Sequence, residues 1–313
     1  MNNYLFAFDS NYETQGTVAI YSLLENVSEK INIFVIRDSS NKSIRLHSKI
    51  QEHKNLNKIT YKFFDTNAFF HNIELAHVSK ATFYRLFITD IFNDADLELI
   101  YLDADIVCTN DPTFLVNKTF EEMKNKNLTF GFLDELYRNQ YDEPFKRLGM
   151  KKDKYFNAGV MFLNVFEWNK KKLTEKSLEK IAELKDKAKF WDQDILNSLV
   201  DGDYLSIDSK LNSKTSETIS QKNVKDEIFI HYSGKSKPWS VGGILEEYSY
   251  VYHNYYKQLY KRDFHIVTTN RKNALLKLFK LLRLINSMKF FTKKVLVSYI
   301  LNSTFSIIFK LKK

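Results

Sequence analysis

Residues 99–107 of the chain read Leu99-Ile100-Tyr101-Leu102-Asp103-Ala104-Asp105-Ile106-Val107, an apolar run that leads into two carboxylates. The run predicts a buried strand, and residues two apart on an extended chain share one face. Asp103 and Asp105 can therefore grip one hard divalent cation, which would bridge phosphate oxygens and neutralise a departing diphosphate. A lone Asp-x-Asp is more often a solvated loop or a helix cap, and Asp94-Ala95-Asp96 has the same spacing, so the apolar lead-in is what favours a metal site.

Outward from this strand, segments of strand and helix character alternate through the first half of the chain. We expect strands at 4–8, 31–36, 59–64 and 97–102, and helices at 17–24, 43–53 and 80–92. This βαβα order predicts an α/β fold with a mostly parallel sheet and helices on both faces. Ligands of such sheets lie beyond the carboxyl ends of the strands, where Asp9 and Asp103 both stand, so these two residues can converge.

The composition supports one large folded domain, alone or with an appendage. Of the 313 residues, 44% are hydrophobic and 27% are charged, which allows a packed core and argues against disorder. The single cysteine, Cys108, excludes an intrachain disulfide and is predicted to be buried and inert. The N-terminus has no basic segment before its short apolar run, and no stretch reaches the roughly 18–20 apolar residues of a membrane span, so we expect a cytoplasmic protein.

Positive charge is concentrated at the C-terminus. The net charge is +9, yet residues 271–313 hold 11 Lys and Arg with no acid, which leaves 36 Lys and Arg against 38 Asp and Glu in residues 1–270. A slightly acidic body argues against a nucleic-acid-binding core. A non-catalytic protein that binds nucleic acid through the tail is an alternative, and strongly salt-dependent RNA binding would favour it.

The basic tail has an amphipathic helical pattern. Leu275, Leu278, Leu282 and Ile285 recur at helical spacing, with two lysines and an arginine between them. This pattern predicts a helix that lies on an anionic membrane surface, where each base contributes about 1 kcal/mol. A helix packed on the body or on a second copy is the alternative. We therefore divide the chain into a body, residues 1–262, and a basic amphipathic membrane-association tail, residues 263–313.

A second cluster of polar groups follows a short apolar strand predicted at 228–230. His231 comes first, and Gly234 and Lys237 follow it. An imidazole added to two carboxylates suits Mn²⁺ or a similar first-row ion. Gly234 would let the backbone approach a phosphate, and Lys237 would pair with it. A satisfied histidine at a strand end, followed by a turn, explains the same residues equally well.

Four further segments carry motifs. They read Phe8-Asp9-Ser10-Asn11-Tyr12, Lys80-Ala81-Thr82-Phe83-Tyr84-Arg85-Leu86, Tyr155-Phe156-Asn157-Ala158-Gly159-Val160-Met161-Phe162-Leu163-Asn164 and Phe190-Trp191-Asp192-Gln193-Asp194-Ile195-Leu196-Asn197. With these motifs, and with Asp103-Ala104-Asp105 and His231 in their order, the chain resembles glycosyltransferase family 8. Its members are retaining galactosyl- and glucosyltransferases that include bacterial lipopolysaccharide enzymes. The resemblance runs from about residue 3 to about residue 260 and implies a GT-A fold, a Rossmann-like sheet, for a catalytic domain of residues 1–262.

The resemblance implies that one group of residues surrounds a UDP-sugar donor. Asp9 would meet the uracil, Asn11 would contact the nucleotide, and Tyr12 would stack on the base. An amide and an aromatic ring at a strand-to-helix turn also suit a planar base on chemical grounds. Asn11 is equally a candidate helix N-cap. Arg85 would contact the donor sugar or phosphate, whereas a surface ion pair is the plainer interpretation of this residue.

The remaining roles also come from the resemblance. A Mn²⁺ or Mg²⁺ ion would be held by Asp103, Asp105 and His231, and Asp103 would also lie beside the nucleotide. The residues that would contact the diphosphate, the hexose or the acceptor are Gly234, Lys237, Asn157, Ala158, Gly159, Asp192, Gln193 and Asp134. Among these, Asp192 would bind sugar hydroxyls, and Gln193 would lie on the face of the sugar opposite the leaving group. Asp134 would lie between donor and acceptor.

The reaction implied is transfer of galactose or glucose from a UDP-sugar, with retention, to a glycan acceptor of lipopolysaccharide or another cell-surface glycan. Because the amide of Gln193 is a poor nucleophile, front-face attack is favoured over double displacement. The acceptor is expected to be lipid-linked, at the inner face of the plasma membrane. The rival enzyme class, metal-dependent nucleotidyltransferases, uses a Gly-rich phosphate loop near the N-terminus, which Asp9-Ser10-Asn11-Tyr12 lacks.

Overall fold

The structure is a computed structural model of the chain. It describes residues 1–38, 46–65, 80–92, 97–135, 144–184, 187–215, 226–234, 237–240 and 248–264. The tail predicted over 263–313 lies outside the described residues beyond residue 264. The first residues of the helix predicted at 43–53 also lie outside them.

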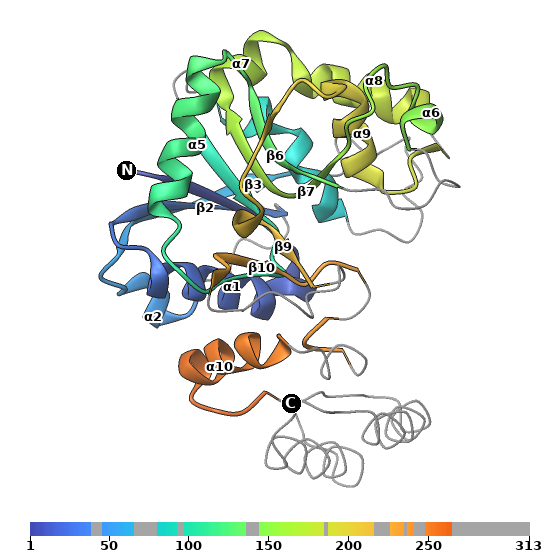
Figure 1. The fold of residues 1–313 in the computed structure, drawn as a ribbon. Coiled ribbons are helices and arrows are strands. Elements are labelled where there is room, and N and C mark those ends of the chain that lie inside the picture. The colour runs from blue at the N-terminus through green and yellow to red at the C-terminus, as the bar shows by residue number, and fades with distance from the viewer. Residues whose placement is uncertain are drawn as a thin grey trace, which may run out of the picture. The chain divides into compact units, whose positions relative to one another are not determined.

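A seven-stranded sheet forms the centre of the fold, in the order β3-β2-β1-β4-β7-β6-β8 (Figure 1). Its strands are β1 (Asn3–Ala7), β2 (Ile31–Asp38), β3 (Leu56–Phe64), β4 (Glu98–Leu102), β6 (Phe130–Asp134), β7 (Phe156–Asn164) and β8 (Leu205–Ser206). Strands β1 to β4 pair in parallel, as do β6 and β8, whereas β7 runs antiparallel to both its neighbours. The mostly parallel sheet predicted from the sequence is therefore confirmed.

The buried strands carry the apolar runs that predicted them. Four of the five residues of β1 and eight of the nine residues of β7 are buried. A central strand covered on both faces is apolar along most of its length rather than alternating, and the run Ala158–Leu163 of β7 fits this expectation. Aromatic rings fill the space beside it, because Phe132 of β6 stacks on Phe156 of β7 with ring centroids 3.6 Å apart. Trp168 is fully buried against Phe130 in the same layer.

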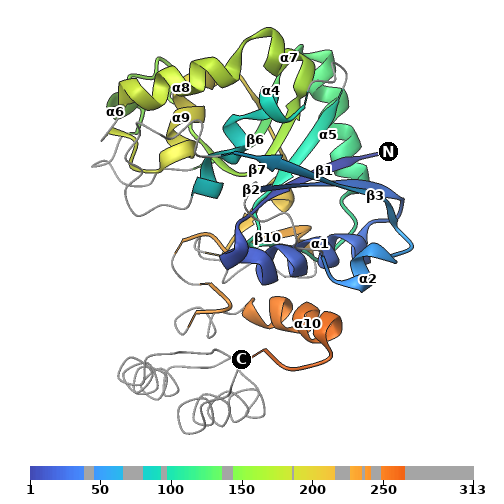
Figure 2. The same cartoon turned by 180° about the vertical axis from the view of Figure 1, so that it is seen from behind.

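Helices cover both faces of the sheet, as the βαβα order predicted. The helices of this part of the chain are α1 (Glu13–Asn26), α2 (Ser48–Gln51), α4 (Ile88–Ile91), α5 (Thr113–Asn125), α6 (Pro144–Leu148), α7 (Val165–Lys170), α8 (Leu173–Leu184) and α9 (Trp191–Val200). Figures 1 and 2 show α1 and α2 on one side of the strands and α7 and α8 on the other. This arrangement leaves the carboxyl ends of β1 and β4 at one edge of the sheet.

The segment predicted as one helix at 80–92 is two short helices. Residues Lys80–Leu86 form a 3₁₀ helix, η3, and Phe87 breaks the regular backbone before α4 begins at Ile88. The aromatic residues that suggested helical spacing, Phe83 and Phe87, are both buried in the core. Packing of these rings, rather than helix propensity, decides the local backbone here. The consequence for the site is that Arg85 lies near the end of a tight turn of helix.

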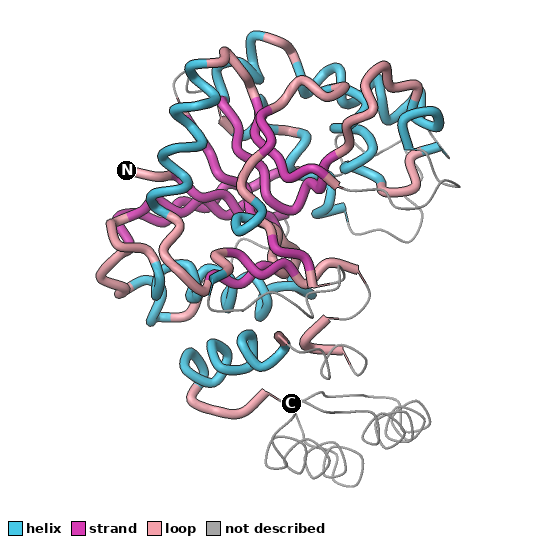
Figure 3. Tube along the Cα trace, viewed as in Figure 1, coloured by secondary structure: helices cyan, strands magenta, loops and turns pink. Residues whose placement is uncertain are grey.

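A second sheet of three short strands, in the order β5-β10-β9, connects distant parts of the sequence (Figure 3). Its strands are β5 (Ile106–Cys108), β9 (Ser213–Lys214) and β10 (Phe229–His231). The backbone N–H of Thr109 donates to the carbonyl of Ile228 at 2.8 Å, which ties the strand after the two aspartates to a segment more than a hundred residues later. Cys108, at the end of β5, is 2% exposed, as predicted.

The chain divides into two compact units. The first comprises Met1–Ser213 and Lys225–Ile230, and the second comprises Lys214–Val224 and His231–Lys313. Helix α10 (Ser249–Tyr260) belongs to the second unit, where Tyr252 packs edge-on against Tyr232. Among the described residues, none of the helices has the length and apolar content that crossing a bilayer requires.

Candidate active site

The loop after β1 is exposed and organised by Asp9. The Asp9 carboxylate accepts hydrogen bonds from the backbone N–H groups of Asn11 at 2.9 Å and Tyr12 at 3.2 Å. Asp9 is therefore the N-cap of a short 3₁₀ helix, η1 (Ser10–Tyr12), and the alternative of Asn11 as the cap is wrong. The side chains of Asn11 and Tyr12 are exposed, and Tyr12 is 37% accessible. Both present a polar or aromatic group that a planar base can meet.

Three predicted metal ligands come together. One ligand atom from each of Asp103, Asp105 and His231 lies within 4.8 Å of the other two. The turn after β4 carries the aspartates, and the last residue of β10 carries the imidazole. Two carboxylate oxygens and one imidazole nitrogen form a donor set that fits a small first-row or alkaline-earth dication such as Mn²⁺ or Mg²⁺. The residues present therefore suit the metal that the resemblance implied.

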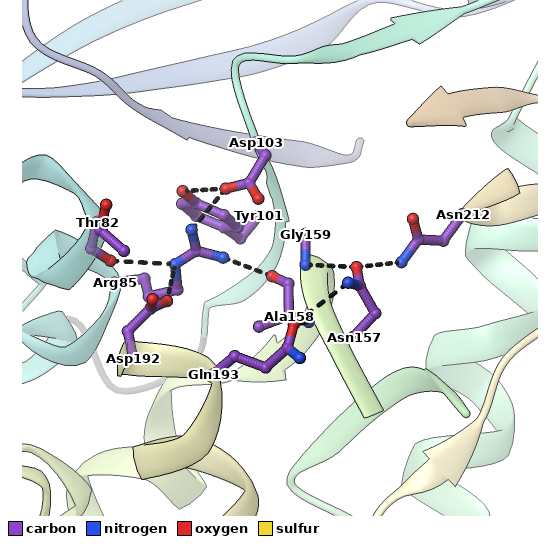
Figure 4. Close-up of polar contacts among 10 residues, drawn as sticks. All are labelled: Thr82, Arg85, Tyr101, Asp103, Asn157, Ala158, Gly159, Asp192, Gln193 and Asn212. Atoms are coloured by element: carbon purple, nitrogen blue, oxygen red, sulfur yellow. Dashed lines mark hydrogen bonds and ion pairs between the residues drawn. The ribbon is translucent and has the colours of Figure 1, made fainter. Parts of the chain in front are cut away.

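Arg85 is the centre of the buried part of the site (Figure 4). Its Nη2 donates to Oδ1 of Asp103 at 2.5 Å, its Nε lies 2.9 Å from Oδ2 of Asp192, and its Nη1 donates to the carbonyl oxygen of Ala158. The guanidinium stacks over the ring of Tyr101 at 4.2 Å from the centroid. Arg85 is only 5% exposed, so the alternative of a surface ion pair is wrong.

This network joins three elements that the sequence places far apart. Arg85 comes from η3, Asp103 follows β4, and Asp192 lies in the first turn of α9. A planar guanidinium offers donors in a fixed fork, so one side chain can hold two carboxylates in a defined geometry. Tyr101 adds a second hydrogen bond to Asp103 Oδ1 at 2.8 Å. Asp103, one of the predicted metal ligands, is thus oriented from two sides.

Burial of Asp192 affects its protonation. The residue is 4% exposed, and desolvation raises the pKa of its carboxyl from the usual value to about 7, although the nearby guanidinium of Arg85 opposes that rise. The negative charge of Asp103 also raises this pKa. Asp192 is therefore a carboxylate whose charge changes close to neutral pH, which is common at functional sites.

Asn157, near the start of β7, links the predicted sugar-side residues (Figure 4). Its side-chain oxygen accepts from the backbone N–H of Gly159 and from Nδ2 of Asn212, both at 3.0 Å. Its Nδ2 donates to the Gln193 side-chain oxygen at 3.2 Å, and the Ala158 backbone N–H donates to the same oxygen at 3.1 Å. The structure thus brings Asn157, Ala158, Gly159 and Gln193 together.

Asp134, at the end of β6, makes structural contacts. One of its carboxylate oxygens accepts from the hydroxyl of Tyr204 at 2.5 Å, and the other accepts from the hydroxyl of Ser206 at 2.7 Å. These bonds tie β6 to its neighbour β8. The next residue, Glu135, is the carboxylate that contacts Gln193, because Nε2 of Gln193 donates to its Oε2 at 3.1 Å.

The two predicted diphosphate contacts lie after β10. Gly234 has φ +77°, and a Cβ there would meet no atom within 4 Å. This left-handed backbone suits glycine and leaves open space beside the chain. Lys237 donates from Nζ to the carbonyl oxygen of Tyr232 at 2.5 Å.

Several site residues escaped sequence reasoning. Asn212 is fully buried and holds Asn157, yet it lies in a polar stretch with no pattern that marks it. Tyr101 is part of the quoted apolar strand, where its hydroxyl carries no sequence signal. Glu135 was not predicted because it lies next to Asp134, and two adjacent acids at a strand end give no indication of which one faces the site.

Comparison with known proteins shows the family to which this chain belongs. The family model described as Glycosyl transferase family 8 matches residues 3–242. A lipopolysaccharide 1,2-glucosyltransferase of Escherichia coli is 30% identical over 253 residues, which cover 76% of this chain and 73% of that protein. A putative glycosyltransferase of Haemophilus influenzae is 26% identical over 257 residues, which cover 76% of this chain and 72% of that protein.

The fold is shared with a solved enzyme. A crystal structure of the galactosyltransferase LgtC, in complex with donor and acceptor sugar analogues, matches with a TM-score of 0.69 at 22% identity. The match covers 82% of this chain and 96% of that one. With the family model spanning most of its length and the GT-A architecture in place, the chain belongs to glycosyl transferase family 8, whose enzymes use a UDP-sugar donor and a divalent metal.

Proposed function

We propose that this glycosyltransferase moves galactose or glucose from a UDP-sugar to a glycan acceptor, with retention at the anomeric carbon, in the synthesis of lipopolysaccharide or a related cell-surface glycan. Its relatives include a lipopolysaccharide 1,2-glucosyltransferase, and its fold is that of a galactosyltransferase, which supports both the acceptor class and the two candidate hexoses.

The observation that carries the proposal is the fork of Arg85 between Asp103 and Asp192. One carboxylate belongs to the predicted metal motif and the other to the predicted sugar-binding turn of α9. A buried arginine that bridges them fixes the distance between the diphosphate side and the hexose side before any donor binds. Such preorganisation is the main contribution that a protein makes to a reaction in which charge develops on a leaving group.

The residues proposed to hold a Mn²⁺ or Mg²⁺ ion are Asp103, Asp105 and His231. When bound, the ion supplies electrostatic stabilisation of the negative charge that grows on the UDP diphosphate. Asp9, Asn11 and Tyr12 bind the uridine, as a helix cap, an exposed amide and an exposed ring at the carboxyl end of β1 allow. Lys237 and the open backbone at Gly234 contact the diphosphate.

Gln193 faces the reacting sugar in this proposal. Because an amide is a weak nucleophile, the acceptor hydroxyl attacks from the same face as the leaving UDP. The departing phosphate takes the acceptor proton, and the side-chain oxygen of Gln193 stabilises positive charge on the sugar. Asn157, Ala158, Gly159 and Asp192 surround the hexose. We assign Asp134 to the support of β8, because both of its oxygens accept hydrogen bonds from that strand region.

The setting proposed for the enzyme is the cytoplasmic face of the plasma membrane. The acceptor is lipid-linked, residues 1–262 form the catalytic domain, and the basic segment 263–313 binds the anionic surface. Deletion of residues 271–313 is expected to abolish binding to anionic vesicles while binding of UDP persists. Vesicle binding that is unchanged by the deletion would contradict the role of the tail.

The test of the enzyme activity is UDP release from a panel of UDP-sugars without acceptor, with and without Mn²⁺. We expect release from UDP-galactose or UDP-glucose, and a loss of about a hundredfold or more in Asp105→Ala. Glu121→Ala, which removes an exposed carboxylate on α5, is the matched control and is expected to keep full activity. Metal-independent release, or equal release by Asp105→Ala, would contradict the metal site. No release from any donor, with no UDP binding by calorimetry, would contradict the function.

A further inference from the structure

The amide of Gln193 has all four of its hydrogen-bonding positions engaged. Its oxygen accepts from the Ala158 backbone N–H and from Nδ2 of Asn157, at 3.1 and 3.2 Å. Its nitrogen lies 3.1 Å from Oε2 of Glu135 and 3.1 Å from the hydroxyl oxygen of Tyr155. An amide has two donor protons and two acceptor lone pairs, so these four contacts saturate it. The direction of the amide then depends on which neighbours donate and which accept.

The hydroxyl of Tyr155 is committed to a buried carboxylate. Asp194, the residue next to Gln193 in the sequence, is completely buried, and its Oδ1 accepts a hydrogen bond from the Tyr155 hydroxyl at 2.6 Å. The same carboxylate accepts from Nη1 and Nη2 of Arg147 on α6, at 2.7 and 3.2 Å, and from the backbone N–H of Phe190 at 2.9 Å. A carboxylate held by a guanidinium fork offers only acceptor sites, so Tyr155 has to be the donor in this contact.

The number of available protons then determines the orientation of the Gln193 amide. A tyrosine hydroxyl has one proton, and Tyr155 uses it on Asp194, so its oxygen can only accept from Gln193. In the opposite orientation the Gln193 oxygen would face the oxygens of Tyr155 and Glu135, and its nitrogen would face the N–H of Ala158. Asn157 cannot turn to help, because its own oxygen accepts from the Gly159 backbone N–H. Every contact would be repulsive.

We propose that Arg147, Asp194 and Tyr155 are positioning residues that hold the Gln193 amide with its oxygen toward β7, and this role rests on the function proposed above. Tyr155 touches Gln193, Asp194 sets the direction of the Tyr155 proton, and Arg147 keeps Asp194 in place. The oxygen that is thereby presented beside Asn157 and Ala158 is the one that stabilises positive charge on the sugar. A reversed amide would present two partial positive charges there instead.

The chain contains a matched pair for a control. Tyr204 donates its hydroxyl to Asp134 at 2.5 Å, as Tyr155 does to Asp194, and both tyrosines are buried in the first unit. The Tyr204 pair makes no contact with Gln193 among the described residues. Removal of either hydroxyl leaves a carboxylate with one donor fewer. Asp194 is completely buried, whereas Asp134 is only partly buried and water can replace the lost donor there, so Tyr204→Phe is expected to cost no more stability than Tyr155→Phe. Only the Tyr155 pair should change the reaction.

The experiment compares Tyr155→Phe with Tyr204→Phe by steady-state kinetics with the UDP-sugar that the wild-type enzyme uses. For Tyr155→Phe we expect kcat to fall about tenfold with an unchanged donor KM, since one oriented hydrogen bond is lost at the reacting centre. Tyr204→Phe is expected to keep kcat within about twofold of the wild type, with a Tm no lower than that of Tyr155→Phe. Equal kcat values in the two variants would overturn the proposal.

A double-mutant cycle distinguishes positioning from general damage. If Tyr155 acts through Gln193, then Tyr155→Phe introduced into Gln193→Ala should change kcat by less than about twofold. UDP release with enzyme in excess makes this background measurable. A full tenfold loss in both backgrounds would show that the hydroxyl acts elsewhere and would overturn the proposal. Failure of the wild-type chain to release UDP from any donor would instead overturn the proposed function, and this role would fall with it.

Discussion

The two halves of the proposed donor site are built differently. The nucleotide half is the exposed loop Asp9–Tyr12, whose hydrogen bonds join residues two or three positions apart. The sugar half is the buried network around Arg85, whose bonds reach Asp103 and Ala158, 18 and 73 positions away. Tyr12 is 37% exposed, whereas Arg85 is 5% exposed.

This difference indicates how each half works. An exposed ring contributes binding energy when a base covers it, so we expect the proposed nucleotide half to provide affinity. Charges that are already buried and paired in the folded protein do not reorganise when the donor binds, so we expect the proposed sugar half to provide transition-state geometry. Mutations in the sugar half should therefore reduce both stability and turnover, and mutations in the nucleotide half should reduce donor affinity alone.

The largest effect is expected for Arg85→Ala. The substitution leaves the carboxylates of Asp103 and Asp192 without their common cation, one of them in a buried position. Breaking such a pair by removing one partner destabilises a protein by about 3–5 kcal/mol. We expect that loss in urea unfolding, together with a fall in UDP release of a hundredfold or more.

Arg85→Lys separates charge from geometry. It keeps the positive charge but has no planar fork, so we expect most of the stability and little of the activity to return. If Arg85→Ala unfolded at the same urea concentration as the wild type, the network would contribute nothing to the free energy of unfolding. The proposed difference between the two halves of the site would then be wrong.

A smaller effect on activity is expected when the pH is lowered, because Asp192 becomes protonated. Because its pKa is raised to about 7, the carboxylate becomes protonated as pH falls below 7, and kcat/KM should then drop about tenfold per pH unit. Between the ordinary pKa and 7 the native state holds the extra proton, so this group makes the protein less stable as pH rises through that range. Activity should therefore be lost below pH 7 without any loss of stability from Asp192.

Asp192→Asn provides the control for this pH step. The variant keeps the shape of the side chain and removes its charge, so its activity should be low at every pH. The decline of kcat/KM below pH 7 that we attribute to Asp192 should be absent. A wild-type kcat/KM that stays flat from pH 8 to pH 5.5 would contradict the raised pKa.

The smallest effect is expected for Tyr12→Ala. Loss of a stacking ring costs about 1–2 kcal/mol of binding, so the KM for the UDP-sugar should rise roughly tenfold while kcat and Tm stay unchanged. Tyr12→Phe keeps the ring and should behave like the wild type. A fall in Tm or kcat for Tyr12→Ala would show that the loop supports the fold, and the distinction between the halves would be wrong.

Much of the fold followed from local sequence. The apolar run before Asp103 predicted β4, and the βαβα order predicted a mostly parallel sheet, which the structure confirms. The helix predicted at 80–92 is broken at Phe87, because aromatic packing overrides helical spacing there. The resemblance supplied most of the site residues and implied Asp134, but it gave no role to Glu135, the next residue on the chain, which contacts Gln193.

The sequence by itself determined the central strands β1 to β4 and the chemical groups of the site, because strand periodicity and the Asp-x-Asp spacing are local properties. Tertiary structure alone decided which group meets which. The fork of Arg85 spans three elements, and the proton of Tyr155 is directed by Asp194, 39 residues later. The physical reason is that burial and proton donation depend on neighbours that only folding brings within 3 Å or so, and no spacing along the chain records them.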